Sequence, residues 1–357
     1  MENMTGACDM QTNSNTVKRS AYFCMCGTGL FMIVSKLLSF VLSDVYYKAA
    51  AENFDRTEIV LTNIIRALFG ANTGVSIAAA RSVLGSGIPD SFFAMFTTLV
   101  TLVIPAYVFS KLSGRGISDG FPVKGKLSPD FLSLLFAAQL FMTGAAVIAS
   151  FFYDFIMPDS SSFISSGTAA AYTGEADGYT LLISALETAV FVPIAEEYVF
   201  RGAVFGALRK YGTNFAVIAS AFVFGVMHFS ASQSMYAFAF GIISAMLVVY
   251  TGNIKTSVLF HAFNNFYITL SDYLSAADVS SYYIFTDMFY ILCAVLGIFG
   301  IMKLFSKGGF AAKYSDLVQI SDERNGLCGT CAGVGQIFTV PVIMFLVLYA
   351  SRVFALG

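Results

Sequence analysis

Long apolar stretches separated by short polar ones dominate the pattern of the chain. A helix that crosses a bilayer needs about 20 mostly apolar residues. Runs of this kind predict spans at 21–45, 92–111, 131–157, 178–200, 213–231, 235–251, 254–271, 283–305 and 335–355. The pattern therefore predicts an all-α fold, a polytopic transmembrane bundle of about eight or nine spanning helices.

Polar and mixed segments divide this predicted bundle into parts. We expect 1–20 to be a polar N-terminal tail, 21–130 to hold N-terminal membrane helices and a mixed loop, and 131–305 to be the membrane core. The remainder, 306–357, reads as a cytoplasmic loop and a C-terminal helix. The stretch 58–87, with Arg66 and Arg81 among apolar residues, predicts an amphipathic helix on the membrane surface. The first apolar run contains Lys36 and lacks a small-x-small cleavage site, which predicts a retained signal anchor.

Composition and charge support a lipid environment. The chain has 57% hydrophobic and only 12% charged residues, whereas soluble domains average about 25% charged residues. A net charge of −2 leaves no basic surface for phosphates, so we expect the lipid bilayer and no nucleic acid as a partner. Lysines and arginines concentrate in the loops that are cytoplasmic if the N-terminus is cytoplasmic, so we predict that orientation.

Ionisable residues within a membrane span are candidates for function. The segment 191–202 contains Glu196, Glu197 and Arg201. Glu197 and Arg201 are four residues apart, which predicts an ion pair on one helix face. Glu196 points about 100° away and lacks a basic partner on its own face, as expected for a general base. Pro193, about one turn earlier, predicts a loosened helix with a freed carbonyl. A purely structural charge network is the alternative for these residues.

The only two histidines of the chain, His228 and His261, both fall within predicted spans. His261 shares a helix face with Asn265, four residues later. Imidazole is the commonest metal ligand, and two imidazoles with one carboxylate form a known zinc set with an open position for water. At about 1.5 Å per residue, the predicted spans place His261 about 9 Å and His228 about 24 Å from the cytoplasmic surface, an unexplained difference in depth.

Three motifs occur in this order on separate predicted helices: Glu196-Glu197-x-x-x-Arg201, Phe224-x-x-x-His228 and His261-x-x-x-Asn265. Their combination resembles the CPBP family of intramembrane proteases, which includes the type II CAAX prenyl endopeptidases and the bacterial Abi proteins. The resemblance covers about 181–270. It implies an integral protein of the bacterial plasma membrane whose motif residues converge on a cavity open to the cytoplasm. It also implies a membrane-associated peptide or protein substrate, including prenylated C-terminal peptides.

The resemblance further implies roles for the motif residues. Glu196 and His228 activate the attacking water. His261 and Asn265 bind a metal or stabilise the oxyanion. Glu197 and Arg201 hold the structural framework of the site. In one mechanism zinc bound by Glu196, His228 and His261 supplies the activated water, and Glu197 is then a candidate base. In the other, Glu196 and His228 act without a metal. The first is slightly favoured.

Two other classes of function compete with the peptidase. One is a non-catalytic membrane immunity protein that binds a peptide or lipid in the same cavity. The other is a proton or ion pathway lined by Glu196, Glu197, His228 and Glu187. Separately, Cys328 and Cys331, with Cys24 and Cys26, suggest a thiolate zinc site or a redox pair, although free thiols are the favoured interpretation.

Overall fold

The computed structural model describes residues 2–69, 73–85, 88–114, 127, 130–156, 178–277, 279–306, 309–325, 327 and 331–355. All regular elements among these residues are helices, which confirms the predicted all-α class. The α-helices are α1 (Glu2–Glu52), α2 (Phe54–Phe69), α3 (Thr73–Gly85), α4 (Ile88–Thr98), α5 (Ile104–Leu112), α7 (Phe131–Ile156), α9 (Gly178–Ala185), α10 (Val192–Glu197), α11 (Gly206–Leu208), α12 (Thr213–Val226), α13 (Ala231–Thr251), α14 (Ile254–Ala277), α15 (Val279–Ser306), α16 (Phe310–Arg324) and α17 (Val340–Ala355). Short π-helical segments are η1 (Leu99–Val103), η2 (Leu186–Phe191) and η3 (Tyr198–Phe205), and short 3₁₀ segments are η4 (Arg209–Tyr211) and η5 (Val334–Ile337).

Five stretches within the described residues are long and apolar enough to cross a membrane, which indicates an integral membrane protein. They are Ser14–Glu52, Pro89–Leu112, Phe131–Phe151, Gln233–Thr251 and Ser280–Phe305. Large apolar side chains cover the outer faces of these helices, for example Val147 on α7 and Phe299 on α15. Such faces are costly in water and stable against lipid. The total of about eight or nine spans stays a prediction.

Helices of the structure extend beyond several of the predicted segments, whose boundaries stay predictions. Helix α1 begins at Glu2, so the predicted polar tail continues the first membrane helix. The helical run that starts at Gly178 continues to Tyr211 instead of ending at 200. The predicted C-terminal cytoplasmic loop contains a further helix, α16. These differences have one cause: hydrophobicity marks the part of a helix that meets lipid, whereas backbone hydrogen bonds extend the helix beyond it.

The mixed stretch at 58–87 forms two helices instead of one. Helices α2 and α3 pack on each other, and Arg81 Nε lies 3.0 Å from Glu58 Oε2 across their interface. Helix α2 has a pronounced apolar face, as an interfacial helix requires.

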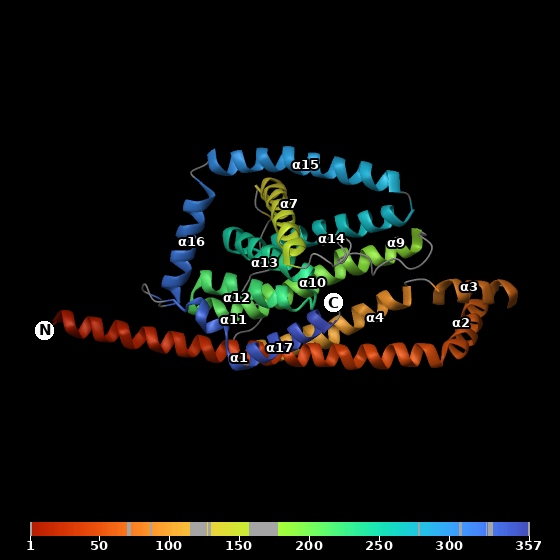
Figure 1. The fold of residues 1–357 in the computed structure, drawn as a ribbon, viewed down its shortest axis with the longest axis horizontal. Coiled ribbons are helices and arrows are strands. Elements are labelled where there is room, and N and C mark those ends of the chain that lie inside the picture. The colour runs from red at the N-terminus through yellow and green to blue at the C-terminus, as the bar shows by residue number, and fades with distance from the viewer. Residues whose placement is uncertain are drawn as a thin grey trace.

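The helices that carry the three motifs lie in the middle of the molecule (Figure 1). Helix α12 packs closely on α13, and α14 contacts α10 and α13. Helix α1 runs along one edge with α17 beside it, and α7 packs on α15 at the opposite edge (Figure 1). A glycine allows α12 and α13 to approach: a Cβ atom at Gly241 would lie 2.8 Å from the Cα of Ala221. The motif helices are thus enclosed by helices from both ends of the chain.

Candidate active site

The paired glutamates lie on a helix whose hydrogen bonding changes near Pro193. The π-helical segment η2 precedes the proline, and η3 follows Glu197. The N–H of Val192 bonds to the carbonyl of Glu187, five residues back. The next donor in this pattern would be residue 193, which is proline and has no N–H. The carbonyl of Thr188 is therefore left without its helical partner, as the sequence predicted for a carbonyl near Pro193.

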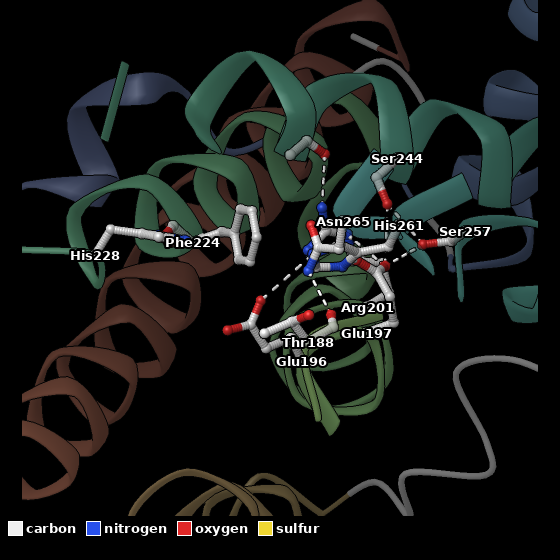
Figure 2. A network of polar contacts seen from close by, with 11 residues as sticks. Thr188, Glu196, Glu197, Arg201, Phe224, His228, Ser244, Ser257, His261 and Asn265 are labelled. Carbon is white, nitrogen blue, oxygen red and sulfur yellow. Dashed lines mark hydrogen bonds and ion pairs between the residues drawn. The ribbon is translucent and has the colours of Figure 1, made fainter. Parts of the chain in front are cut away.

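Asn265 supplies the missing donor. Its Nδ2 donates to the carbonyl oxygen of Thr188 over 2.8 Å, and the hydroxyls of Thr188 and Thr269 lie 2.6 Å apart beside this bond. The interaction connects α14 to the proline-containing helix. The family resemblance implied that Asn265 binds a metal or stabilises the oxyanion. In the structure, the side-chain N–H group of Asn265 donates to a backbone carbonyl instead (Figure 2).

Replacing Asn265 by Leu is expected to destabilise the protein by about 1–3 kcal/mol, because the Thr188 carbonyl then lacks a donor. The cost should shrink when Pro193 is also replaced by Ala, since residue 193 then carries an N–H that can bond to Thr188. Thermal unfolding of the two single variants and the double variant in detergent measures this coupling. Additive costs would contradict the assignment of Asn265 to the proline-freed carbonyl.

Glu197 and Arg201 form the ion pair that their spacing predicts. Glu197 Oε2 lies 3.1 Å from Arg201 Nε, and both side chains are fully buried. The guanidinium also lies 4.7 Å from the ring centroid of Phe224, and its Nη2 donates to the carbonyl of Gly241 over 3.4 Å. A buried charge needs such compensation, so the pair acts as one unit.

Two serines that sequence reasoning missed complete the surroundings of Glu197. Ser244 on α13 donates to Glu197 Oε2 over 3.0 Å, and Ser257 on α14 bonds to the same oxygen. Both serines are buried in apolar helices. Ser257 precedes His261 by four residues, so the two share a face of α14. That spacing was the available signal, although serine is too common in membrane helices to stand out alone.

His261 lies between the two glutamates (Figure 2). Its Nδ1 is 2.9 Å from Glu197 Oε1, and its Nε2 is 3.7 Å from Glu196 Oε2. A carboxylate only accepts hydrogen bonds, so the Nδ1–H group donates a hydrogen bond to Glu197, and Nε2 is the nitrogen directed to Glu196. Glu197 thus fixes the orientation of the imidazole. Glu196 is the more accessible acid, with 19% of its side chain exposed.

His228 lies beyond the end of α12 instead of inside a helix as predicted. Helix α12 ends at Val226, and the His228 N–H bonds to the carbonyl of Gly225 in the following turn. The ring Nδ1 is 2.8 Å from the carbonyl oxygen of Phe224, which requires a proton on Nδ1 and leaves Nε2 for other partners.

The phenyl ring of Phe224 separates the two histidines. Its centroid is 4.9 Å from that of His228 and 5.9 Å from that of His261, and both contacts are edge-on (Figure 2). The two imidazoles are therefore neighbours of one phenyl ring, which makes their difference in depth smaller than the predicted spans suggest.

The side chains predicted to bind zinc do not converge on one point. Ligand atoms lie about 2 Å from a zinc ion and hence close to one another. Glu196 Oε2 and His261 Nε2 are 3.7 Å apart, close enough for both atoms to bind one zinc ion. The ring of Phe224, however, lies between His261 and His228. Within the described residues, no group of three histidine, cysteine or acidic side chains is placed to hold a metal ion. This arrangement therefore does not fit a metal bound by Glu196, His228 and His261.

Within the described residues, the cysteines likewise belong to no group of side chains that could hold a metal ion. Cys24 and Cys26 are half-buried on α1, and Cys331 is exposed, with its thiol 3.6 Å from Asp322. Cys328 lies outside the described residues. Cys24, Cys26, Cys293 and Cys331 are free thiols.

Comparison with known proteins identifies the region that contains this site. Residues 178–267 match a family model described as type II CAAX prenyl endopeptidase Rce1-like. No curated protein and no solved structure matches the chain. The matched region contains all three motifs and the helices that bring them together. Residues 178–267 are a domain of the Rce1-like type II CAAX prenyl endopeptidase family, a family of membrane proteases.

Proposed function

We propose that this protein is an intramembrane peptidase that hydrolyses peptide bonds of membrane-associated substrates. One observation carries the proposal: His261 is directed to Glu196 by a buried Glu197 that is itself neutralised by Arg201. The arrangement pairs an accessible carboxylate with an oriented imidazole, as water activation requires. The description of the matching family adds the expected substrate class, a peptide with a prenylated C-terminus.

Glu196 is the general base in this mechanism. The attacking water donates one hydrogen bond to Glu196 Oε2 and a second to His261 Nε2. Its lone pair then points to the carbon of the scissile carbonyl. Glu196 takes the proton as the water oxygen bonds to the carbonyl carbon. When the C–N bond breaks, Glu196 returns that proton to the leaving amine nitrogen. The products are a carboxylic acid and an amine, and the acid then gives its proton to the amine, so that a carboxylate and an ammonium leave and Glu196 regains its starting state.

The remaining motif residues support this reaction in different ways. Glu197 and Arg201 keep His261 in one orientation, and Asn265 connects α14 to the helix of Glu196. His228 presents Nε2 on the other side of Phe224, where it can donate a proton to the oxyanion when protonated. This assignment pairs Glu196 with His261, whereas the sequence-based prediction paired Glu196 with His228.

Zinc chemistry is the competing mechanism and is separable by experiment. Purified protein in lipid vesicles is expected to cleave a prenylated peptide at a rate unchanged by 1,10-phenanthroline, with far less than one zinc per chain by elemental analysis. Product formation is followed by mass spectrometry. Loss of activity in the chelator, with recovery on adding zinc, would instead assign Glu196, His228 and His261 as ligands. Peptide binding without any cleavage would favour the non-catalytic immunity or binding protein.

A further inference from the structure

A lysine from outside the matched domain lies near the candidate active site. Lys36 belongs to α1, and its ammonium is 5.1 Å from the ring centroid of Phe229, the residue that follows His228. It interacts electrostatically with Glu196 and with His228. An ionisable residue in the middle of an apolar helix is costly in a membrane and is usually retained for a function.

Phe229 fixes this relation between α1 and the site. It has a left-handed backbone with φ 55°, a conformation that large side chains rarely adopt. Its ring packs against Phe40 on α1 and against Phe345 and Tyr349 on α17, with centroid distances of 5.7, 5.2 and 5.7 Å. Such strained backbone persists where surrounding contacts hold it. The two flanking helices therefore hold the turn of His228 against the face of α1 that carries Lys36.

Lys36 forms no close ion pair within the described part of the chain. No described carboxylate lies within 4.0 Å of its ammonium, and no described acceptor hydrogen-bonds to it. Arg201, the other cation near Glu196, is fully buried and paired with Glu197. An ammonium carries three donors, and the Phe229 ring accepts none of them as a conventional hydrogen bond. Among the described residues, Lys36 is thus a cation near Glu196 that remains available to an anionic ligand.

We propose that Lys36 binds the free terminal carboxylate of the peptide substrate and thereby directs cleavage to bonds near a C-terminus. The proposal rests on the peptidase function proposed above. Without this cation, a terminal carboxylate would approach the negative charge of Glu196 uncompensated. A charge-assisted contact with Lys36 offsets that repulsion and fixes the distance from the chain end to the scissile bond. Specificity for chain ends is then supplied by α1, and hydrolysis by the matched domain.

The test compares two fluorescein-labelled prenylated peptides that differ only in a free carboxylate or a carboxamide at the C-terminus. Affinity for each is measured in the Glu196→Gln background, where cleavage cannot distort binding, and kcat and KM are measured in the native protein. Lys36→Met removes the charge, and Lys36→Arg retains it. Lys48→Met is the matched control, because Lys48 lies on the same helix and is exposed. Thermal unfolding of each variant in detergent verifies folding.

The protein with Lys36 intact should bind the carboxylate peptide about ten-fold or more tightly than the carboxamide. Lys36→Met should remove this preference, mainly through KM, while Lys36→Arg and Lys48→Met should keep it. An equal loss for both peptides, or no preference in the native protein, would overturn the proposal. If no peptide is cleaved, the proposed peptidase function fails, and the binding preference still decides the role of Lys36.

Discussion

Replacing Glu196 by Gln is expected to lower peptide cleavage by about 10²–10⁴-fold while the protein remains folded. Glutamine keeps the shape of the side chain and can accept a hydrogen bond, but it cannot take a proton from water. Product formation from a prenylated peptide in lipid vesicles measures the loss. Glu196 is partly exposed and, unlike Glu197, pairs with no fully buried arginine or lysine among the described residues, so its replacement should leave thermal unfolding nearly unchanged.

Glu187 provides the matched control for this variant. It is an acidic residue of the same helical run, at η2, and it makes no described contact with either histidine. Glu187→Gln should therefore keep activity within a few-fold of the native protein. Equal losses in both variants would show that the assay reports general damage to this helix, and full activity of Glu196→Gln would exclude Glu196 as the base.

Replacing Arg201 by Met is expected to destabilise the protein by about 3–5 kcal/mol, because Glu197 would then be a buried charge without its partner. The ion pair is fully inaccessible on both sides, and the guanidinium also packs on Phe224. Unfolding by heat or denaturing detergent measures the loss. The double variant with Glu197→Gln should recover part of it, since no unpaired carboxylate remains.

An exposed ion pair on α1 provides a comparison for the loss of stability expected from Arg201→Met. Lys48 and Asp44 are 2.7 Å apart with side chains 69% and 61% exposed. Lys48→Met should cost less than about 1 kcal/mol, because water and salt screen such a pair. A similar small cost for Arg201→Met would contradict the view that the Glu197–Arg201 pair supports the site.

The sequence alone determined the class of the fold and part of the site. Apolar runs such as 131–157 and 283–305 closely match α7 and α15, because lipid tolerates only backbones that satisfy their own hydrogen bonds. The pairing of Glu197 with Arg201 followed from their spacing, which the period of a helix fixes regardless of tertiary context. Likewise, proline lacks an N–H in any surroundings, so a freed carbonyl was predictable from Pro193.

Tertiary structure decided which groups meet across helices. The position of His261 between two glutamates, the Phe224 ring between the histidines, and the approach of Lys36 from α1 all depend on how separate helices rotate and pack. Spacing along one helix carries no information about these contacts. The partner of Asn265 could not be predicted from the sequence either, since its acceptor is a backbone carbonyl distant in sequence. The sequence thus determined the residues and their helix faces, whereas packing alone determined their partners, because helix rotation depends on contacts summed over the whole bundle.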